Sequence, residues 1–388
     1  TANNTAFQLQ SIFGQQFDQS TKSIAQLRRC TRCVLPETMP FITFDLQGVC
    51  NYCQNYQKIH YRGKESLDEE IKKYVGSSKD AKTVVCLSGG RDSSYGLYYI
   101  KKVLGLNAIA YSYDWGMVTD LARRNQARMC GELGVEHIIV SADIRTKRAN
   151  IRKNVLAWLH KPDLGTIPLF MAGDKQYFYF ANQVMKQTRS KFIVMAENEL
   201  ERTHFKHGFS NIKPAAVDKA PYVEKFSDKL AIAAYYARQF AKNPRYINSS
   251  IIDSFDAFAY YYFIPRDYLY LFQYIPWSED EISNVLLKDF DWEIAPDTHS
   301  TWRIGDGTAP FYNYIYYLVA GFTENDTFRS NQIREGTMDR ATAMALVQRD
   351  NQPRYESIDW YCKTISIDTK ETLQRIHTIP PLYANKKE

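Results

Sequence analysis

Residues 83–93 read Thr83-Val84-Val85-Cys86-Leu87-Ser88-Gly89-Gly90-Arg91-Asp92-Ser93, an apolar run that ends in a turn of serine and glycine. The β-branched and apolar residues 83–87 predict a buried parallel strand. Residues 95–104 have helical periodicity, which Gly105 is placed to end. A strand, a glycine-rich turn and a helix in this order direct free backbone N–H groups at an anion. We therefore predict that residues 88–93 bind phosphate.

The side chains of this turn suit that role. Gly89 and Gly90 let a ligand approach the backbone closely, and Ser88 and Ser93 offer hydroxyl donors. Asp92 fits beside phosphate only if it meets a metal ion, caps the helix, or does both. The turn is neither a Walker A motif nor a dinucleotide fingerprint, because Gly-Lys-Ser/Thr and G-x-G-x-x-G are absent. The alternative is a turn that only begins a helix.

Three further apolar segments predict strands of the same sheet, namely 108–112, 137–140 and 192–195. Helical segments lie between them, and this alternation predicts an α/β fold with a doubly wound parallel sheet. Ligands of such sheets bind outside the carboxyl ends of the strands. The segments expected at those ends are 88–93, 113–116 and 196–199.

Polar residues near the strand ends are further candidates for the site. Glu197, Asn198 and Glu199 are predicted to contact substrate or magnesium, with a solvated helix start as the alternative. Lys175 precedes a predicted helix and is a candidate for binding pyrophosphate as it departs. Arg202 is a candidate for contacting a phosphate of the substrate, with a solvated turn as the alternative.

Four cysteines form the pattern Cys30-x2-Cys33 and Cys50-x2-Cys53. This spacing is typical of a zinc site, because each pair turns two thiolates toward one metal and two pairs complete a tetrahedron. Four protein ligands leave no position for water, so we predict a structural Zn²⁺ ion. Unrelated buried cysteines, or a redox pair, are the alternatives. Between the two pairs, residues 41–45 predict a short strand.

The turn at residue 88 matches Ser-Gly-Gly-x-Asp-Ser, and the chain thereby resembles the PP-loop ATP pyrophosphatase superfamily. Those enzymes cleave ATP between its α and β phosphates, transfer AMP to a substrate oxygen, and let a nucleophile displace the AMP. The resemblance implies ATP and Mg²⁺ at the turn, with Ser88, Asp92 and Lys175 in catalytic roles. The nucleotide-binding residues that it implies are Ser88, Gly89, Gly90, Arg91, Asp92, Ser93, Tyr111, Tyr113 and Asp114.

A zinc quartet followed by this turn is a rarer combination than either motif alone. Together with several later stretches of the sequence, this combination resembles the N-acetyl sugar amidotransferase family. That family is related to lipopolysaccharide and pseudaminic or legionaminic acid biosynthesis. The resemblance covers residues 29–348, and its matching stretches are 29–36, 48–53, 88–93, 196–199, 273–277, 321–324 and 333–336. The chain departs from the family at Arg91, where lysine is frequent, at Ala196, where glycine is common, and at residues 302–306.

The family resemblance implies that an acetamido group of a sugar, nucleotide-linked or part of a lipopolysaccharide precursor, becomes an acetamidino group. ATP would adenylylate the amide oxygen, and ammonia would displace AMP. No glutaminase segment is visible, so the resemblance implies separate ammonia-supplying partners, similar to a glutaminase and cyclase pair. One rival is a PP-loop tRNA thiolase, for which the spare cysteines Cys86, Cys130 and Cys362 are not expected near ATP. The other is a non-catalytic nucleotide-binding subunit.

Composition limits the class of protein. The net charge of +6 without a basic run argues against nucleic-acid binding, and no segment is apolar enough to span a membrane. A cytoplasmic location is predicted, because no export signal is visible. The expected regions are a flexible N-terminal tail (1–27), a zinc module (28–60), a PP-loop domain (61–205) and a mainly helical substrate or partner region (206–388). Helices are predicted there over 218–240, 253–274, 279–287 and 338–348.

Overall fold

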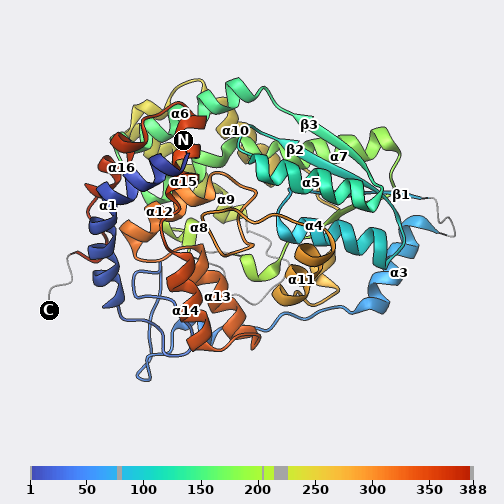
Figure 1. Cartoon of the computed structure of the whole chain (residues 1–388), viewed down its shortest axis with the longest axis horizontal. Helices are drawn as coiled ribbons and strands as arrows, with labels where there is room; N and C mark the ends of the chain where they lie inside the picture. The colour runs from blue at the N-terminus through green and yellow to red at the C-terminus, as the bar shows by residue number, and fades with distance from the viewer. Residues whose placement is uncertain (1, 77–80, 203–204, 214–225, 385–388) are drawn as a thin grey trace.

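The computed structural model describes residues 2–76, 81–202, 205–213 and 226–384 of the chain. Its centre is a five-stranded parallel sheet with the strand order β3-β2-β1-β4-β5 (Figure 1). The strands are β1 (Lys82–Cys86), β2 (Asn107–Asp114), β3 (Glu136–Ser141), β4 (Ile193–Met195) and β5 (Leu269–Tyr270). In the register of the sheet, Val84 of β1 lies between Ile109 of β2 and Ile193 of β4. The prediction of an α/β fold with a parallel sheet is confirmed.

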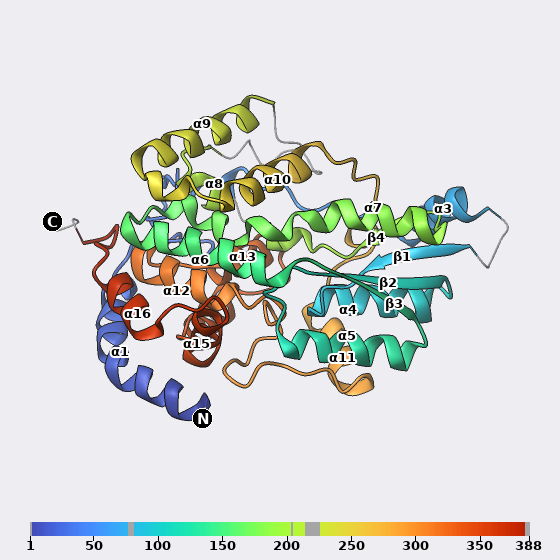
Figure 2. The same ribbon diagram turned by 90° about the horizontal axis from the view of Figure 1, so that it is seen from above.

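Helices cover both faces of this sheet. Figure 2 shows α7 (Gln176–Thr188) on one side and α4 (Arg91–Tyr98), α5 (Asp120–Leu133) and α11 (Glu279–Asp289) on the other. Helix α5 begins where the Thr119 hydroxyl accepts from the N–H of Ala122, and it ends at Gly134 in the left-handed conformation. Helix α11 begins where the Ser278 hydroxyl accepts from the N–H of Glu281. Strands β1, β2 and β4 are buried between these layers, which leaves the carboxyl ends of the strands to form a site.

The second half of the chain is mainly helical. One prediction there was wrong, because residues 253–274 do not form a single helix. Helix α10 (Ser250–Phe263) ends before Pro265, and Leu269–Tyr270 then pairs with β4 as the edge strand β5. Of the helix predicted over 218–240, residues 218–225 lie outside the described residues, and the remainder belongs to α9. The remaining helices of the region are α8 (Phe205–Phe209), α9 (Phe226–Lys242), α12 (Ala309–Ala320), α13 (Glu324–Glu335), α14 (Arg340–Asp350), α15 (Tyr355–Thr364) and α16 (Thr369–His377).

The N-terminal segment is a helix rather than the predicted flexible tail. Helix α1 (Ala2–Ala25) contacts α15 and α16 (Figure 1). Its buried residues include Phe13 and Phe17, and Phe17 stacks on Tyr317 of α12 with 5.1 Å between ring centroids. The tail prediction failed because a few apolar side chains at helical spacing are diluted by glutamine and serine. A partner helix that is distant in sequence supplies the missing burial.

The cysteine segment contains no strand at residues 41–45, contrary to the prediction. Single bridges join Arg29 with Pro36 and Phe44 with Cys50, and a short helix, α2 (Asn51–Gln54), carries Cys53. The positive φ of Phe41, 58°, interrupts an extended course. After this segment, α3 (Lys64–Val75) leads to β1, and α6 (Ile144–His160) follows β3.

Candidate active site and metal centre

The Ser-Gly-Gly turn lies at the carboxyl end of β1 and is held by its own side chains. The Ser93 hydroxyl accepts from the Ser88 N–H at 3.1 Å, and the two hydroxyl oxygens lie 2.9 Å apart. Gly89 has φ +82°, and a Cβ there would lie 2.5 Å from the carbonyl oxygen of Ala122. Only glycine fits this position, so the turn is tied closely to α5. Helix α4 begins directly after Gly90 and directs its N-terminus into the same space.

A cavity of about 630 Å³ opens above the turn. Its walls come from the ends of β1, β2 and β4, from the turn before α7, and from residues 302–306. The structure brings ten of the predicted site residues together on these walls. They are Ser88, Gly90, Arg91, Asp92, Ser93, Tyr113, Lys175, Glu197, Asn198 and Arg202. Their shared location is consistent with one site, and their roles stay predictions.

Other predicted residues do not line this cavity. Tyr111 is fully buried and donates its hydroxyl proton to the Tyr177 carbonyl at 2.9 Å. Asp114 forms an ion pair with Arg123 at 2.7 Å. Glu199 pairs with Arg202 at 2.7 Å, and Gly89 contributes backbone to the turn without lining the cavity. These residues therefore support the walls from behind.

Two carboxyl groups meet beside the turn. Asp92 accepts a hydrogen bond from the Trp277 indole N–H at 2.9 Å, and it is hydrogen-bonded to Glu201. Burial and the neighbouring Asp92 raise the pKa of Glu201 to about 8, so the pair holds a proton near neutral pH. Mg²⁺ prefers carboxylate and phosphate oxygens, so Asp92 and Glu201 fit the cation that accompanies a nucleotide. The prediction missed Glu201, although the acidic run after β4 extends to it.

Arg91 lines the cavity, but its side chain is almost fully buried and anchors the turn to α11. Its side chain is 2% exposed, forms an ion pair with Glu279 at 2.8 Å, and lies over the Trp277 ring at 4.8 Å. Arg329 of α13 binds the other oxygen of Glu279. Burial alone would raise the pKa of Glu279, but Arg91 and Arg329 outweigh it and lower that pKa to about 2. The contacts with Glu279 and Trp277 therefore explain why this chain has arginine at position 91.

Ala196 is the second position at which this sequence differs from that of the family it resembles, and the structure offers a local explanation. A Cβ at Gly96 of α4 would lie 2.6 Å from the Cβ of Ala196. The glycine on the helix makes room for the alanine on the strand end. The absence of a side chain at Gly96 therefore leaves space for the Ala196 methyl group in the cavity wall.

A basic wall faces the turn, and the sequence did not reveal it. Lys206 and Arg303 line the cavity and share the carboxylate of Glu324, at 2.6 and 3.4 Å. Glu324 is fully buried. Burial alone would raise its pKa, but Arg303 and Lys206 lower it to about 2. Arg266 also lines the cavity and covers the Phe178 ring at 4.8 Å. Lys206 comes from the short helix α8, and Arg266 and Arg303 come from loops, where isolated basic residues are common.

Residues 302–306 form a roof over the Ser-Gly-Gly turn, which is to say that they cover it from the cavity side. The Thr119 N–H donates to the Gly305 carbonyl at 3.3 Å, and a bridge joins Val118 with Asp306. A Cβ at Gly305 would lie 3.4 Å from the backbone nitrogen of Gly90. Residues 302–306, where this sequence differs from that of the family it resembles, therefore enclose the site.

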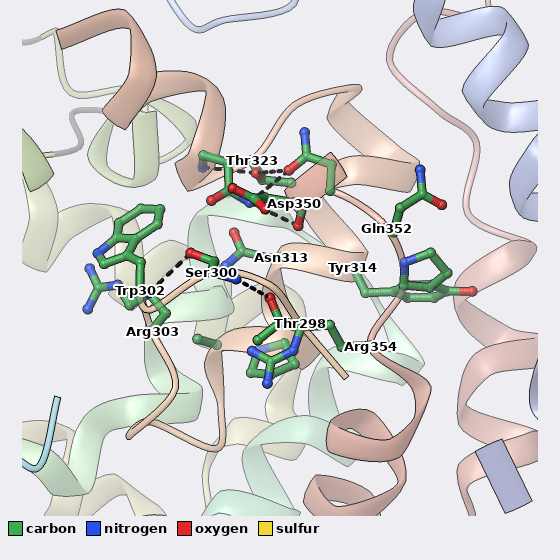
Figure 3. Close-up of a pocket in the computed structure, with 15 residues that line it drawn as sticks. Thr298, Ser300, Trp302, Arg303, Asn313, Tyr314, Thr323, Asp350, Gln352 and Arg354 are labelled. Atoms are coloured by element: carbon green, nitrogen blue, oxygen red, sulfur yellow. Dashed lines mark hydrogen bonds between the residues drawn. The ribbon is translucent and has the colours of Figure 1, made fainter. Parts of the chain in front are cut away.

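A second, smaller cavity lies behind this roof (Figure 3). Trp302 and Arg303 line both cavities, and the smaller one also borders α12 and the segment that joins α14 to α15. Its volume of about 50 Å³ has room for water molecules but not for a nucleotide. The larger cavity is therefore the candidate active site.

Cys86 lines the larger cavity, which corrects the prediction that no spare cysteine lies near the nucleotide site. Burial raises the pKa of its thiol to about 12. A thiol with this pKa stays protonated at neutral pH and is a poor nucleophile. Cys130 and Cys362 do not line the cavity.

The four predicted metal ligands are buried and lie together. All four sulfur atoms lie within 4.8 Å of one another, with Cys30 and Cys53 at 3.9 Å and Cys33 and Cys50 at 3.8 Å. Zinc–sulfur bonds of about 2.3 Å in a tetrahedron place sulfurs about 3.8 Å apart, whereas a disulfide needs about 2.05 Å. The donor set therefore fits Zn²⁺.

Groups around the cysteines favour thiolates. Backbone N–H groups of Cys33 and Cys50 donate to the Cys30 sulfur at 3.4 and 3.2 Å. Arg334 of α13 donates to the sulfurs of Cys53 and Cys33 at 3.3 and 3.4 Å. A positive guanidinium balances part of the charge of a four-thiolate zinc centre, and such outer partners fix the ligands in place.

Comparisons with known proteins do not assign a family. No protein-family model and no curated protein matches the chain. A solved structure of an NH3-dependent NAD synthetase from Campylobacter jejuni, in complex with nitrate ion, is 15% identical, with a TM-score of 0.26. It covers 52% of this chain and 96% of its own. Among the described helices, none is long and apolar enough to cross a membrane. The fold therefore rests on the observed sheet, and the site on its own geometry.

Proposed function

We propose that the protein is an ATP-dependent, AMP-forming enzyme of the PP-loop type. One observation carries the proposal. A single cavity joins the Ser88–Ser93 turn, the carboxyl pair of Asp92 and Glu201, and the basic residues that face them. This arrangement suits a polyanion that is held with a divalent cation and loses pyrophosphate.

The turn and its neighbours would bind the nucleotide. The backbone of residues 88–90 and the start of α4 offer N–H donors to phosphate, and Lys175 would receive the departing pyrophosphate. Burial would lower the pKa of Lys175, but Asp174 and its other neighbours outweigh it and raise that pKa, so the amine stays charged. Asp92 and Glu201 would hold Mg²⁺, which would neutralise charge on the triphosphate when bound.

The proposed acceptor is the acetamido oxygen of an N-acetyl sugar. The oxygen would attack the α-phosphorus, pyrophosphate would leave, and ammonia would then displace AMP to give an acetamidino group. Asn198 and Arg202 are the proposed contacts to the sugar, and Glu197 lines the same wall. The sequence resemblance supports this acceptor, and the polar wall after β4 provides donors and acceptors for a sugar. Separate proteins would supply the ammonia.

A tRNA thiolase is the second candidate, and the position of Cys86 in the cavity is the observation that favours it. The high pKa of the Cys86 thiol weighs against a sulfur-transfer role. The third candidate, a non-catalytic nucleotide-binding subunit, would retain the turn without turnover.

One assay separates the three candidates. The protein is incubated with ATP, Mg²⁺, ammonium and UDP- or CMP-linked N-acetyl sugars, and AMP and pyrophosphate are measured. Formation of AMP that depends on the sugar supports the amidotransferase, and formation that depends on tRNA supports the thiolase. Release of ADP, or no turnover with any acceptor, would contradict the proposal.

The variant Asp92→Asn tests the carboxyl pair. It keeps the size of the side chain but removes a charge from the proposed cation site, so AMP formation should fall by about 100-fold or more. The melting temperature should stay close to that of the parent. Asp120→Asn, at an exposed position of α5, is the control and should retain activity. Activity of Asp92→Asn within about threefold of the parent would remove Asp92 from the proposed site.

A further inference from the structure

The carboxylates that line the large cavity differ in how they are paired. Asp92 and Glu201 contact each other and Arg91, Asp174 pairs with Lys175 at 3.1 Å, and Asp306 accepts from the Thr308 N–H at 2.9 Å. Glu197 is the exception. Within the described part of the chain, no hydrogen bond or ion pair joins its carboxylate to another residue, and its side chain is exposed to the cavity.

The position of Glu197 places it beside the proposed reaction centre. It follows β4 by two residues, and β4 is the direct neighbour of β1, which leads into the phosphate turn. No histidine is among the described residues that line the cavity. An unpaired carboxylate next to the turn is therefore the group best placed to take a proton from a bound molecule.

The surroundings of Glu197 keep its carboxylate basic. The protein around the cavity separates the carboxylate from bulk water and so raises its pKa, and positive charges that do not touch it oppose this effect without cancelling it. These charges belong to Arg202, Arg266, Lys175 and Arg303. The other titratable neighbours are Cys86, Tyr177, Tyr268, Tyr270 and Glu199. Burial raises the pKa of each of them.

We propose that Glu197 is the proton acceptor for the nitrogen nucleophile in the second half-reaction, an inference that rests on the proposed function. Nitrogen that the separate proteins supply, or that is added as an ammonium salt, is protonated when it reaches the cavity. This ammonium gives a proton to the Glu197 carboxylate and becomes ammonia. The ammonia nitrogen forms a bond to the activated amide carbon, and the bond from that carbon to the AMP oxygen breaks. AMP leaves with the electron pair, and the protons pass through Glu197 to solvent.

This role differs from binding a sugar hydroxyl. A residue that only binds the sugar acts in both half-reactions, because the sugar must be present for adenylylation. A proton acceptor for nitrogen acts only after AMP has been transferred. The two half-reactions can be measured separately, since adenylylation alone exchanges pyrophosphate into ATP.

The variant Glu197→Gln, which retains the size of the side chain, tests the inference. Exchange of labelled pyrophosphate into ATP with the acceptor sugar should stay within about threefold of the parent, whereas ammonium-dependent product should fall by about 100-fold or more. Hydroxylamine is mostly unprotonated at neutral pH and needs no such base. With hydroxylamine as the nucleophile, the variant should work within about threefold of the parent.

The pH profile gives an independent measurement. Glu197 must be deprotonated, so the ammonium-dependent rate of the parent should fall as the pH drops through a value above the ordinary glutamic acid range. Glu197→Gln should lose this limb and follow only the supply of free ammonia. Glu197→Asp should recover part of the rate, and Glu132→Gln, at an exposed position of α5, is the matched control.

The outcomes separate the inference from the proposed function. Equal losses of exchange and product in Glu197→Gln would overturn the inference and assign Glu197 to binding. Full activity with ammonium would also overturn it. The absence of sugar-dependent exchange in the parent protein would instead contradict the proposed function.

Discussion

Helices α12, with the sequence APFYNYIYYLVA, and α13, with the sequence ENDTFRSNQIRE, follow one another in the chain (Figure 1). Both are mostly buried. Helix α12 is buried by aromatic packing, as where Phe311 stacks on Tyr361 with 4.5 Å between centroids. Helix α13 is buried by pairing of its charges. Glu324 binds Lys206, Asp326 binds Arg29, and both partners are distant in sequence.

The two helices differ in the substitutions that they tolerate. An apolar core accepts side chains of similar volume with small losses. A buried ion pair is weak evidence of stability, but removing one partner leaves a buried charge and is strongly destabilising. Helix α12 therefore accepts other apolar side chains of similar volume, whereas α13 requires the particular residues that pair with its charges.

Helix α13 also reaches both candidate sites. Arg334 contacts the cysteine sulfurs, and Arg329 contacts Glu279, which holds Arg91 of the phosphate turn. Glu324 holds two basic residues of the cavity wall. The polar side chains of α13 therefore contact both the cysteine cluster and residues that hold the cavity wall.

The largest effect should follow from breaking the metal end of this connection. Cys50→Ser removes one ligand, and the zinc content of the purified protein should fall below about half an equivalent. Zinc binding in small modules amounts to about 10 kcal/mol or more, so the melting temperature should fall sharply. Cys130→Ala, on α5, is the control and should retain zinc. Normal zinc content in Cys50→Ser would rule out a four-cysteine site.

A smaller loss is expected from Glu324→Gln at the cavity end of α13. The change leaves Lys206 and Arg303 without their carboxylate, so the free energy of unfolding should fall by about 3 kcal/mol. The lowered pKa of Glu324 means that its stabilisation is present above 4.5 and lost as the pH falls toward about 2. Denaturant titrations over that range should show a flatter pH dependence in the variant. An unchanged dependence would show that the ion pairs do not contribute.

The smallest effects should come from two matched changes on α12. The Tyr312 hydroxyl donates to the Glu324 carboxylate at 2.8 Å, whereas that of Tyr316 donates to the Leu164 carbonyl at 3.3 Å. Tyr312→Phe should lower the free energy of unfolding by about 2 kcal/mol, and Tyr316→Phe by about 1 kcal/mol or less. Equal losses in denaturant titrations would mean that the charge of α13 does not strengthen its contact with α12.

The parts of the molecule that local sequence determines were predictable. The strand over residues 83–87, the turn after it and the cysteine pattern depend on neighbours in the chain, and they were found. Glu201, Lys206 and Arg303 were not found, because their positions depend on partners contributed by other helices. The amino-acid sequence of α13 resembles that of a solvent-exposed helix. Periodicity does not distinguish charged residues that are paired inside the protein from charged residues in water. The edge strand β5 was missed because two residues carry too little pattern.

The contact between Arg334 and Cys33 joins residues 301 positions apart. During synthesis the four cysteines leave the ribosome long before the arginine, and N-terminal segments fold first. The four sulfurs therefore lack their guanidinium donor until α13 has been made, and the strands of the sheet precede that donor in the chain. A cluster formed by residues 30–53 is thus completed by one of the later parts of the chain to be translated.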